Sequence, residues 1–247
     1  MNNVIAIVAI YFAFVLYIAI YTYFRGYIFP AIYTSFARES SNPSYFPKTL
    51  LDEEEIFEKQ GYFYVGEEKV PGEIPQNTIT RIYLTPDHKG VALFQLIDLP
   101  EIEAYSSIEV YSFFRDSGFI YATRNDYPVS AQAIARDVFK FQIATTFAMS
   151  ELLDFHNNLR MIVQESSQEL IVLDQGNIEK LFNDRRLDEW KFQESRGIVT
   201  KVSESNYKFT FKAQLLTAFK VSLPFLNRKS PPSEQLHRFR RKIKRFQ

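Results

Sequence analysis

The longest apolar run of the chain lies at its N-terminus. From Val4 to Phe24 there is no charged residue, proline or glycine. An α-helix of this length measures roughly 30 Å, close to the hydrocarbon thickness of a bilayer. No Lys or Arg precedes the run and no small-x-small cleavage site follows it, which favours an uncleaved anchor over a signal peptide. We therefore predict a transmembrane helix, with residues 1–38 as anchor and juxtamembrane segment and the proline-containing residues 39–48 as a linker.

The first positive side chains follow the apolar run, at Arg25, Arg38 and Lys48. By the positive-inside rule, this places the N-terminus outside and the rest of the chain in the cytoplasm, at a bacterial inner membrane. Small residues at Ala6, Ala9 and Ala13 are spaced as in a helix–helix contact within a membrane. The same alanines are also ordinary constituents of an apolar helix, so both interpretations stay open.

The middle of the chain alternates apolar and polar positions as β-hairpins do. Residues 78–84 and 91–97 flank the turn residues 85–90, and residues 105–114 and 119–123 flank a second turn at 115–118. Residues 138–143 predict one more strand. Because all these runs are rich in β-branched and aromatic residues, we expect a small antiparallel sheet.

Apolar residues that recur every three or four positions predict helices over 145–165, 177–195 and 213–225. An acidic helix is expected at residues 50–60, with Thr49 as its N-cap and Gly61 after its end. Its acids, Asp52 to Glu55, suit a solvated first turn; a metal cluster is the alternative. The fold class is thus α+β: a transmembrane helix, then a soluble domain at 49–226 with a small antiparallel sheet and two to three packed helices.

The last segment, residues 227–247, predicts a basic amphipathic helix. Residues 228–247 hold eight Lys/Arg and one Glu, whereas the whole chain is neutral. Such a helix can lie on anionic lipid headgroups, dock on an acidic partner or RNA, or remain a solvated tail. Its apolar stripe and its basic residues are the predicted membrane-surface or partner contacts: Leu236, Arg238, Phe239, Arg240, Arg241, Lys242, Ile243, Lys244, Arg245 and Phe246.

The composition offers little for catalysis. The chain has no cysteine, which excludes disulfides and thiolate chemistry. It also lacks the glycine motifs of phosphate loops and nucleophile elbows. His156 is the only histidine in a predicted helix, but its spacing from Glu151 and Asp154 puts neither acid on its face. We predict no catalytic, cofactor-binding or metal site and expect His156 at the helix surface or core edge.

Two resemblances extend the interpretation. Gly197-Ile-Val199, a polar turn, and Tyr207-Lys-Phe-Thr210 before a helix look like the wing of winged-helix DNA-binding domains. The residues YSFF, FIYATRN and SELLDFH, with this hairpin and the basic end, resemble single-span bacterial membrane-anchored proteins of unknown function. The first resemblance implies DNA contact, but the preceding helix has four Lys/Arg against five acids, a poor balance for phosphate.

The predicted function is therefore a non-catalytic accessory or assembly protein that holds a protein partner at the membrane surface. Its partners would be the lipid bilayer, anionic headgroups at the basic tail and a protein complex; nucleic acid is not expected. One alternative is a membrane-tethered regulator that binds DNA through the wing. The other is a hydrolase of unrecognised type, for which His156 is the candidate residue.

Overall fold

The computed structural model describes most of the chain in two compact units. The described residues are 2–25, 28–30, 36–37, 48–68, 77–99, 102–115, 118–124, 138–166, 168–204, 206–222 and 229–243. Unit 1 comprises Met1–Ile32, Tyr127–Ala135 and Asn183–Arg228, and unit 2 comprises Tyr33–Asp126, Arg136–Phe182 and Lys229–Gln247. Both units are thus assembled from segments far apart in the sequence.

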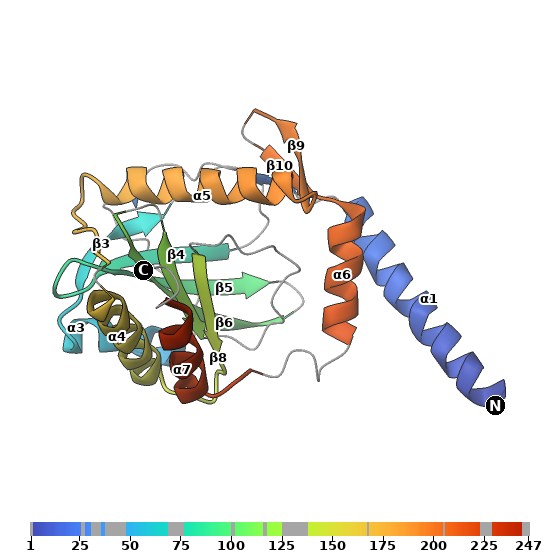
Figure 1. Ribbon diagram of the computed structural model, residues 1–247, viewed down its shortest axis with the longest axis horizontal. Coiled ribbons are helices and arrows are strands. Elements are labelled where there is room, and N and C mark those ends of the chain that lie inside the picture. Colours follow the sequence, from blue (N-terminus) through green and yellow to red (C-terminus); the bar gives the residue numbers. More distant parts are fainter. Residues whose placement is uncertain are drawn as a thin grey trace. The chain divides into compact units, whose positions relative to one another are not determined.

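Unit 2 is built on one mixed sheet in the order β2-β3-β4-β5-β6-β7-β8 (Figure 1). The strands are β2 (Phe36–Ala37), β3 (Phe63–Glu68), β4 (Asn77–Leu84), β5 (Val91–Leu99), β6 (Ile102–Phe113), β7 (Phe119–Arg124) and β8 (Val138–Ile143). Both predicted hairpins are confirmed, with register pairs such as Leu84 with Val91 and Phe113 with Phe119.

The sheet is larger than expected and not wholly antiparallel. β8 runs parallel to β7, with Phe119 opposite Val138. A parallel pair cannot be joined by a tight hairpin turn, unlike the antiparallel pairs of this sheet. The α+β class is confirmed, but the small antiparallel sheet is wrong in this respect, because local hairpin signals carry no information on how a later strand joins.

Three helical regions cover one face of the sheet: the pair α2 (Lys48–Asp52) and α3 (Glu55–Lys59), then α4 (Met149–Glu165), then α7 (Pro232–Ile243) (Figure 1). Their apolar side chains join those of the sheet in one core, in which Phe57, Leu152 and Phe239 are buried. The predicted helix at 50–60 is therefore two short helices, and Thr49 lies inside α2. Gly61 does follow the last turn, at φ +76°.

The opposite face of the sheet is covered by the first turns of α5 (Ile178–Ser195). The Phe182 ring packs edge-on against Tyr111 and Phe113, both at 5.2 Å between ring centroids. Asp174 Oδ1 accepts hydrogen bonds from the backbone N–H groups of Gly176 and Asn177, which fixes the turn that leads into the helix. Gly197, at φ +67°, follows its end.

Unit 1 contains α1 (Asn2–Arg25), the second part of α5, α6 (Phe211–Ser222) and a three-stranded sheet. The sheet order is β1-β10-β9, from β1 (Ile28–Pro30), β9 (Val199–Ser203) and β10 (Asn206–Phe209). The predicted β9–β10 hairpin is confirmed. Trp190 of α5 stacks on Tyr207 of β10, with 5.4 Å between centroids and 9° between planes.

Candidate functional site: an apolar helix pair and a basic helix

The first candidate site is the pair of helices α1 and α6 in unit 1. One stripe of α1 is fully buried at Val15 and Ala19, where it meets Ala218 of α6. Small residues at Ala19 and Ala218 allow the two helix axes to approach closely. Around this contact pack the partly buried Tyr11, Ile18, Leu215 and Phe219.

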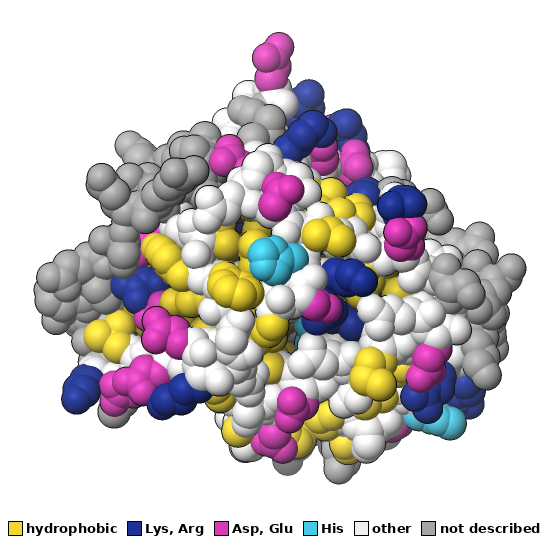
Figure 2. All heavy atoms as spheres, turned by 90° about the vertical axis from the view of Figure 1, so that its left-hand side faces the viewer, with side chains coloured by type: hydrophobic (Ala, Val, Ile, Leu, Met, Phe, Trp, Pro, Cys, Tyr) yellow, Lys and Arg dark blue, Asp and Glu magenta, His cyan; other side chains and the backbone are white. Residues whose placement is uncertain are grey.

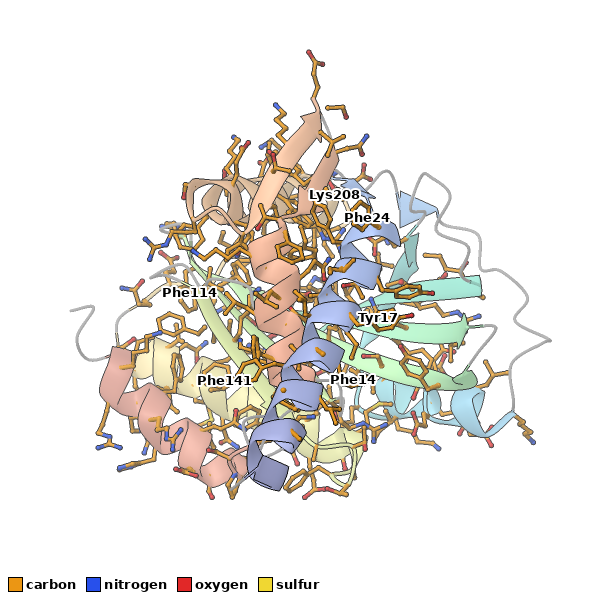
Figure 3. All side chains as sticks on the ribbon, turned by 90° about the vertical axis from the view of Figure 1, so that its right-hand side faces the viewer. Phe14, Tyr17, Phe24, Phe114, Phe141 and Lys208 are labelled. Atoms are coloured by element: carbon orange, nitrogen blue, oxygen red, sulfur yellow. The ribbon has the colours of Figure 1, made fainter. Side chains whose placement is uncertain are left out.

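The two helices run antiparallel. Near one end, Tyr23 packs edge-on against Phe211 at 5.7 Å; towards the other, Phe12 packs against Phe219 at the same distance. There the Tyr11 and Ser222 hydroxyls form a hydrogen bond of 2.7 Å. Among the described side chains, α6 thus covers α1 from about Tyr11 to Tyr23, and Figure 3 shows it beside this part of α1.

The remaining surface of α1 exposes large apolar side chains (Figure 3). Phe14 is 56% exposed, Tyr17 63% and Phe24 78%. Similar exposure is seen at Ile10, Phe12, Leu16, Ile20 and Tyr21. Monomeric soluble proteins rarely expose an apolar surface this continuous, which makes it the first candidate for a contact surface.

The structure confirms a helix over the apolar run Val4 to Phe24, within α1, but not over the whole of residues 1–38, since β1 and β2 follow. The side chains of α1 are described continuously from Ala9 to Phe24. Among the helices of the described residues, none has the length and hydropathy of a membrane span. Ala6, Ala9 and Ala13 are exposed and lie outside the contact with α6. The helix–helix contact predicted for these three alanines stays a prediction.

The second candidate site is α7, in unit 2. Its predicted apolar stripe exists, but it faces the core of this unit: Phe239 and Ile243 are 2% exposed and Leu236 is partly buried. The Phe239 ring packs edge-on against Phe139 at 5.0 Å and Phe141 at 5.2 Å. In this arrangement the stripe is therefore not available for contact with a membrane or a partner.

The basic side chains of α7 remain exposed at Arg238, Arg240, Arg241 and Lys242. Arg238 pairs with Glu234, Arg240 lies 3.9 Å from Glu165, and the Lys242 ammonium lies 4.7 Å from the Phe139 ring centroid. Lys244, Arg245 and Phe246 lie outside the described residues. The surface-contact prediction therefore rests on these four exposed cations.

His156 lies deeper than expected, in the core of unit 2. It is fully buried, and its Nε2 is 3.3 Å from Ser112 Oγ, whose hydroxyl donates to the Lys89 carbonyl at 2.9 Å. Because the serine hydrogen is used there, Nε2–H must donate to Oγ, which leaves Nδ1 as an acceptor with no partner among the described residues. Burial lowers the His156 pKa to about 3, and the nearby Arg160 guanidinium acts in the same direction.

This pair does not have the geometry of a nucleophile and its base. In a catalytic dyad the serine hydroxyl donates to the histidine, whereas Ser112 donates to a backbone carbonyl. Ser112 and His156 are both fully buried, so neither presents a reacting atom to solvent. The arrangement is a polar contact that joins α4 to the sheet, and it gives no support to the hydrolase alternative.

Two of the predicted solvated acids are instead held against the sheet. Glu54 accepts hydrogen bonds from Arg81 and Tyr83 of β4, and Arg81 also donates to Glu67 of β3 at 3.2 Å. Burial raises the Tyr83 pKa, and the hydrogen bond to the Glu54 carboxylate adds to this effect. Glu53 pairs with Arg124 of β7 at 3.2 Å.

The prediction of a solvated first turn is thus wrong for Glu53 and Glu54. It rested on the local helix dipole, which contains no information about arginines on strands distant in the sequence. The alternative metal cluster has no support either: in the described ranges no three His, Asp or Glu side chains gather as metal ligands would.

In the structure, a third strand joins the wing-like β9–β10 hairpin. β1, from the N-terminal part of the chain, pairs with β10 through Phe29 and Tyr207. The preceding helix α5 still carries four Lys/Arg and five acids, so its charge balance is unchanged by the fold.

Comparison with known proteins adds no further constraint. No protein-family model matches the chain, and neither the curated proteins nor the solved structures include one with detectable similarity. Both resemblances noted from the sequence therefore stay predictions, and the functional conclusion depends on the geometry of these surfaces.

Proposed function

We propose that this protein is held at a membrane by α1 and acts there as a non-catalytic accessory or assembly protein that keeps a partner at the membrane surface. The observation that carries the proposal is the exposed apolar surface of α1, from Ile10 to Phe24. In water, each large apolar side chain left exposed forgoes about 1.5–3 kcal/mol of transfer free energy, and lipid would recover most of it. The bilayer is thus the partner that best fits this helix.

The side of the membrane is proposed from charge. Arg25 directly follows the apolar run, and Arg38 and Lys48 come next, so the positive-inside rule favours the cytoplasmic face of a bacterial inner membrane for the rest of the chain. The exposed cations of α7 are compatible with this face, since its leaflet is anionic.

A role in holding a partner is supported by the surface of unit 2. Phe63, Tyr64 and Val172 expose apolar surface, and the Phe63 ring lies 5.2 Å from that of His88. Figure 2 shows hydrophobic side chains gathered on one face of the molecule with acidic and basic side chains among them. Aromatic residues such as Phe63 and Tyr64 are enriched in protein interfaces relative to the rest of the surface.

Membrane attachment is tested by fractionating cells that express the full chain. We expect the wild type to sediment with the membrane fraction and the double variant Phe14→Asp/Tyr17→Asp to be lost from it, because charge is costly in hydrocarbon. Met161→Asp is the matched control, since Met161 is as exposed as Phe14 but lies on α4 of unit 2. Wild-type protein in the soluble fraction would remove the proposal.

The partner is tested by purification from mild detergent. We expect one protein to accompany the wild type in constant ratio and to be lost with Phe63→Asp/Tyr64→Asp, whereas the equally exposed Met161→Asp in α4 should retain it. Wild-type protein that purifies alone after cross-linking in intact cells would contradict the accessory role.

A second candidate is DNA binding, favoured by the β1-β10-β9 sheet that completes the wing-like hairpin. Its signature would be salt-sensitive binding of the full chain to duplex DNA, lost on Lys201→Glu in β9. The net charge of α5 argues against it. Equal binding by Lys201→Glu, or none by the wild type, would eliminate this candidate.

A further inference from the structure

The sequence that builds the helix pair contains no acidic residue. Residues 1–38, which include α1 and β1, have no Asp or Glu, and neither do residues 205–233, which include β10 and α6. By contrast, α5 alone carries five acids. The helix pair therefore combines an apolar surface with purely positive charge.

The charges lie beside the apolar surface. Lys208 Nζ is 4.4 Å from the Tyr23 ring centroid, near the C-terminal end of α1 (Figure 3). On α6, Lys212 is exposed next to Phe211, and Leu216 is 43% exposed one turn further on. α6 is thus an amphipathic helix whose apolar residues are divided between α1 and the outside.

The contact between the helices limits how α1 can enter a bilayer. Lys220 lies between Phe219 and Ser222, whose partners are Phe12 and Tyr11. These two residues are near the midpoint of α1, so a perpendicular span that kept the contact would carry Lys220 to the bilayer centre, where a charge is costly. A helix pair lying in the interface avoids this, because lysine side chains can extend to the headgroups.

We propose that α1 and α6 lie together in the interface of an anionic membrane, with their apolar side chains towards the acyl chains and their lysines at the headgroups. This inference rests on the proposed membrane attachment and makes α6 a second membrane-binding element. It replaces a single perpendicular span by two helices in the plane of the interface.

Charge complementarity selects anionic lipid as the occupant. A second copy of the chain would bring the same acid-free helices, so like charges would meet across the contact. Anionic headgroups instead supply the negative charge that this surface lacks, while the acyl chains cover Phe14, Tyr17 and Leu216.

The depth of both helices can be measured directly because the chain has no cysteine. Single-cysteine variants Phe14→Cys (α1), Leu216→Cys (α6) and Val202→Cys (β9) are prepared in the full chain, each exposed in the structure. In vesicles of phosphatidylcholine and phosphatidylglycerol, we expect positions 14 and 216 to be shielded from a water-soluble maleimide at least tenfold relative to position 202. A fluorophore at both positions should be quenched by nitroxide-labelled lipid.

The outcomes separate the inference from the proposed attachment. Shielding at position 14 without shielding at 216 would mean that α1 enters the membrane alone; the inference would then fail and the attachment would stand. No shielding at either position would overturn both. Shielding at 216 that requires an added acidic protein instead of lipid would also reject lipid as the occupant.

Charge is tested by the double variant Lys208→Gln/Lys212→Gln. Each lysine near an anionic surface should contribute about fivefold to partitioning, so we expect roughly 25-fold weaker partitioning of the variant into anionic vesicles and little change with neutral ones. Lys191→Gln in α5 is the matched control and should behave as wild type. Equal partitioning of all three proteins into anionic vesicles would overturn the anionic selectivity.

Discussion

At the scale of single residues, burial decides how His156 behaves. The sequence predicted a position at the helix surface or core edge, because neither Glu151 nor Asp154 shares a helix face with His156. In the structure it is enclosed between α4 and β6 and is neutral at physiological pH. A histidine held in its neutral form makes the folded state sensitive to acid.

The expected consequence is a loss of stability between pH 7.5 and 5.0. The unfolded chain binds a proton at His156 below its ordinary pKa of 6.5, whereas the folded chain does so only near its pKa of about 3. The contribution of neutral His156 to the free energy of unfolding is therefore complete above pH 6.5. It decreases as the pH falls, and the loss reaches about 2 kcal/mol at pH 5.0. The measurement is the free energy of unfolding of the full chain in mild detergent against pH.

The control for this effect is the exposed His237, on α7. His156→Gln should flatten the decline between pH 7.5 and 5.0, and His237→Gln should leave it unchanged. Asp87, whose pKa is lowered by its hydrogen bonds and by Arg160, titrates below this window and does not contribute. A decline of wild-type size in His156→Gln would show that another group is responsible.

At the scale of elements, the apolar stripe of α7 was predicted correctly, but the surface that covers the stripe was not. The spacing of Leu236, Phe239 and Ile243 predicted one apolar stripe, and the stripe exists. Periodicity specifies that a helix has an apolar face but not which surface covers it. Here Phe139, Phe141 and α4 cover it, together with a hydrogen bond from Gln235 to the Gln142 carbonyl at 2.9 Å.

Truncating this stripe should destabilise unit 2. Phe239→Ala is expected to cost about 3–5 kcal/mol, because a fully buried aromatic ring leaves a cavity. Arg241→Ala, on the exposed side of the same helix, should change the free energy of unfolding by less than about 0.5 kcal/mol. Chemical denaturation followed by circular dichroism gives both values. Unchanged stability in Phe239→Ala, with weakened vesicle binding, would show that the stripe contacts the membrane and not the core of unit 2.

The same distinction between local and distant information explains the rest of the fold. Hairpins 78–97 and 105–123, the helix at 145–165 and the β9–β10 wing follow from local patterns, and each is present. The parallel pairing of β8 with β7, the strand β1 beside β10 and the packing of α6 on α1 join segments far apart in the sequence. A single sequence gives no signal for such pairings, so they could not be predicted.

The candidate site was predictable to the same extent. The apolar run of α1 and the basic face of α7 follow from composition. The ion pairs of Glu54 with β4 and of Glu53 with β7 do not. Only the folded sheet brings Arg81 and Arg124 to these two glutamates. Helix-dipole reasoning alone could therefore place these acids only in solvent.

At the scale of the whole molecule, the chain forms two units with separate cores. Unit 1 buries Val199, Tyr207 and Ala213, whereas unit 2 buries the larger core of its mixed sheet. The only tryptophan, Trp190, stacks on Tyr207 and belongs to unit 1. Its fluorescence therefore reports on one unit and circular dichroism on both.

We expect these signals to separate in selected variants. Tyr207→Ala should lower the midpoint of thermal unfolding followed by Trp190 fluorescence, and Phe239→Ala should lower only the midpoint of the larger circular dichroism change. Each substitution creates a cavity in one core and leaves the other intact. If both variants shifted both midpoints equally, the two units would unfold as one, with α5 transmitting the loss between them.

The hydrogen bond between Tyr11 and Ser222 joins positions that are 211 residues apart. A ribosome adding about 5–20 residues per second therefore needs about 10–40 s after making Tyr11 before its partner exists. During that interval the stripe of α1 that later meets α6 is uncovered along with the rest of the helix. The nascent chain thus presents α1 in its most apolar form, and lipid or a targeting factor has the first opportunity to bind it.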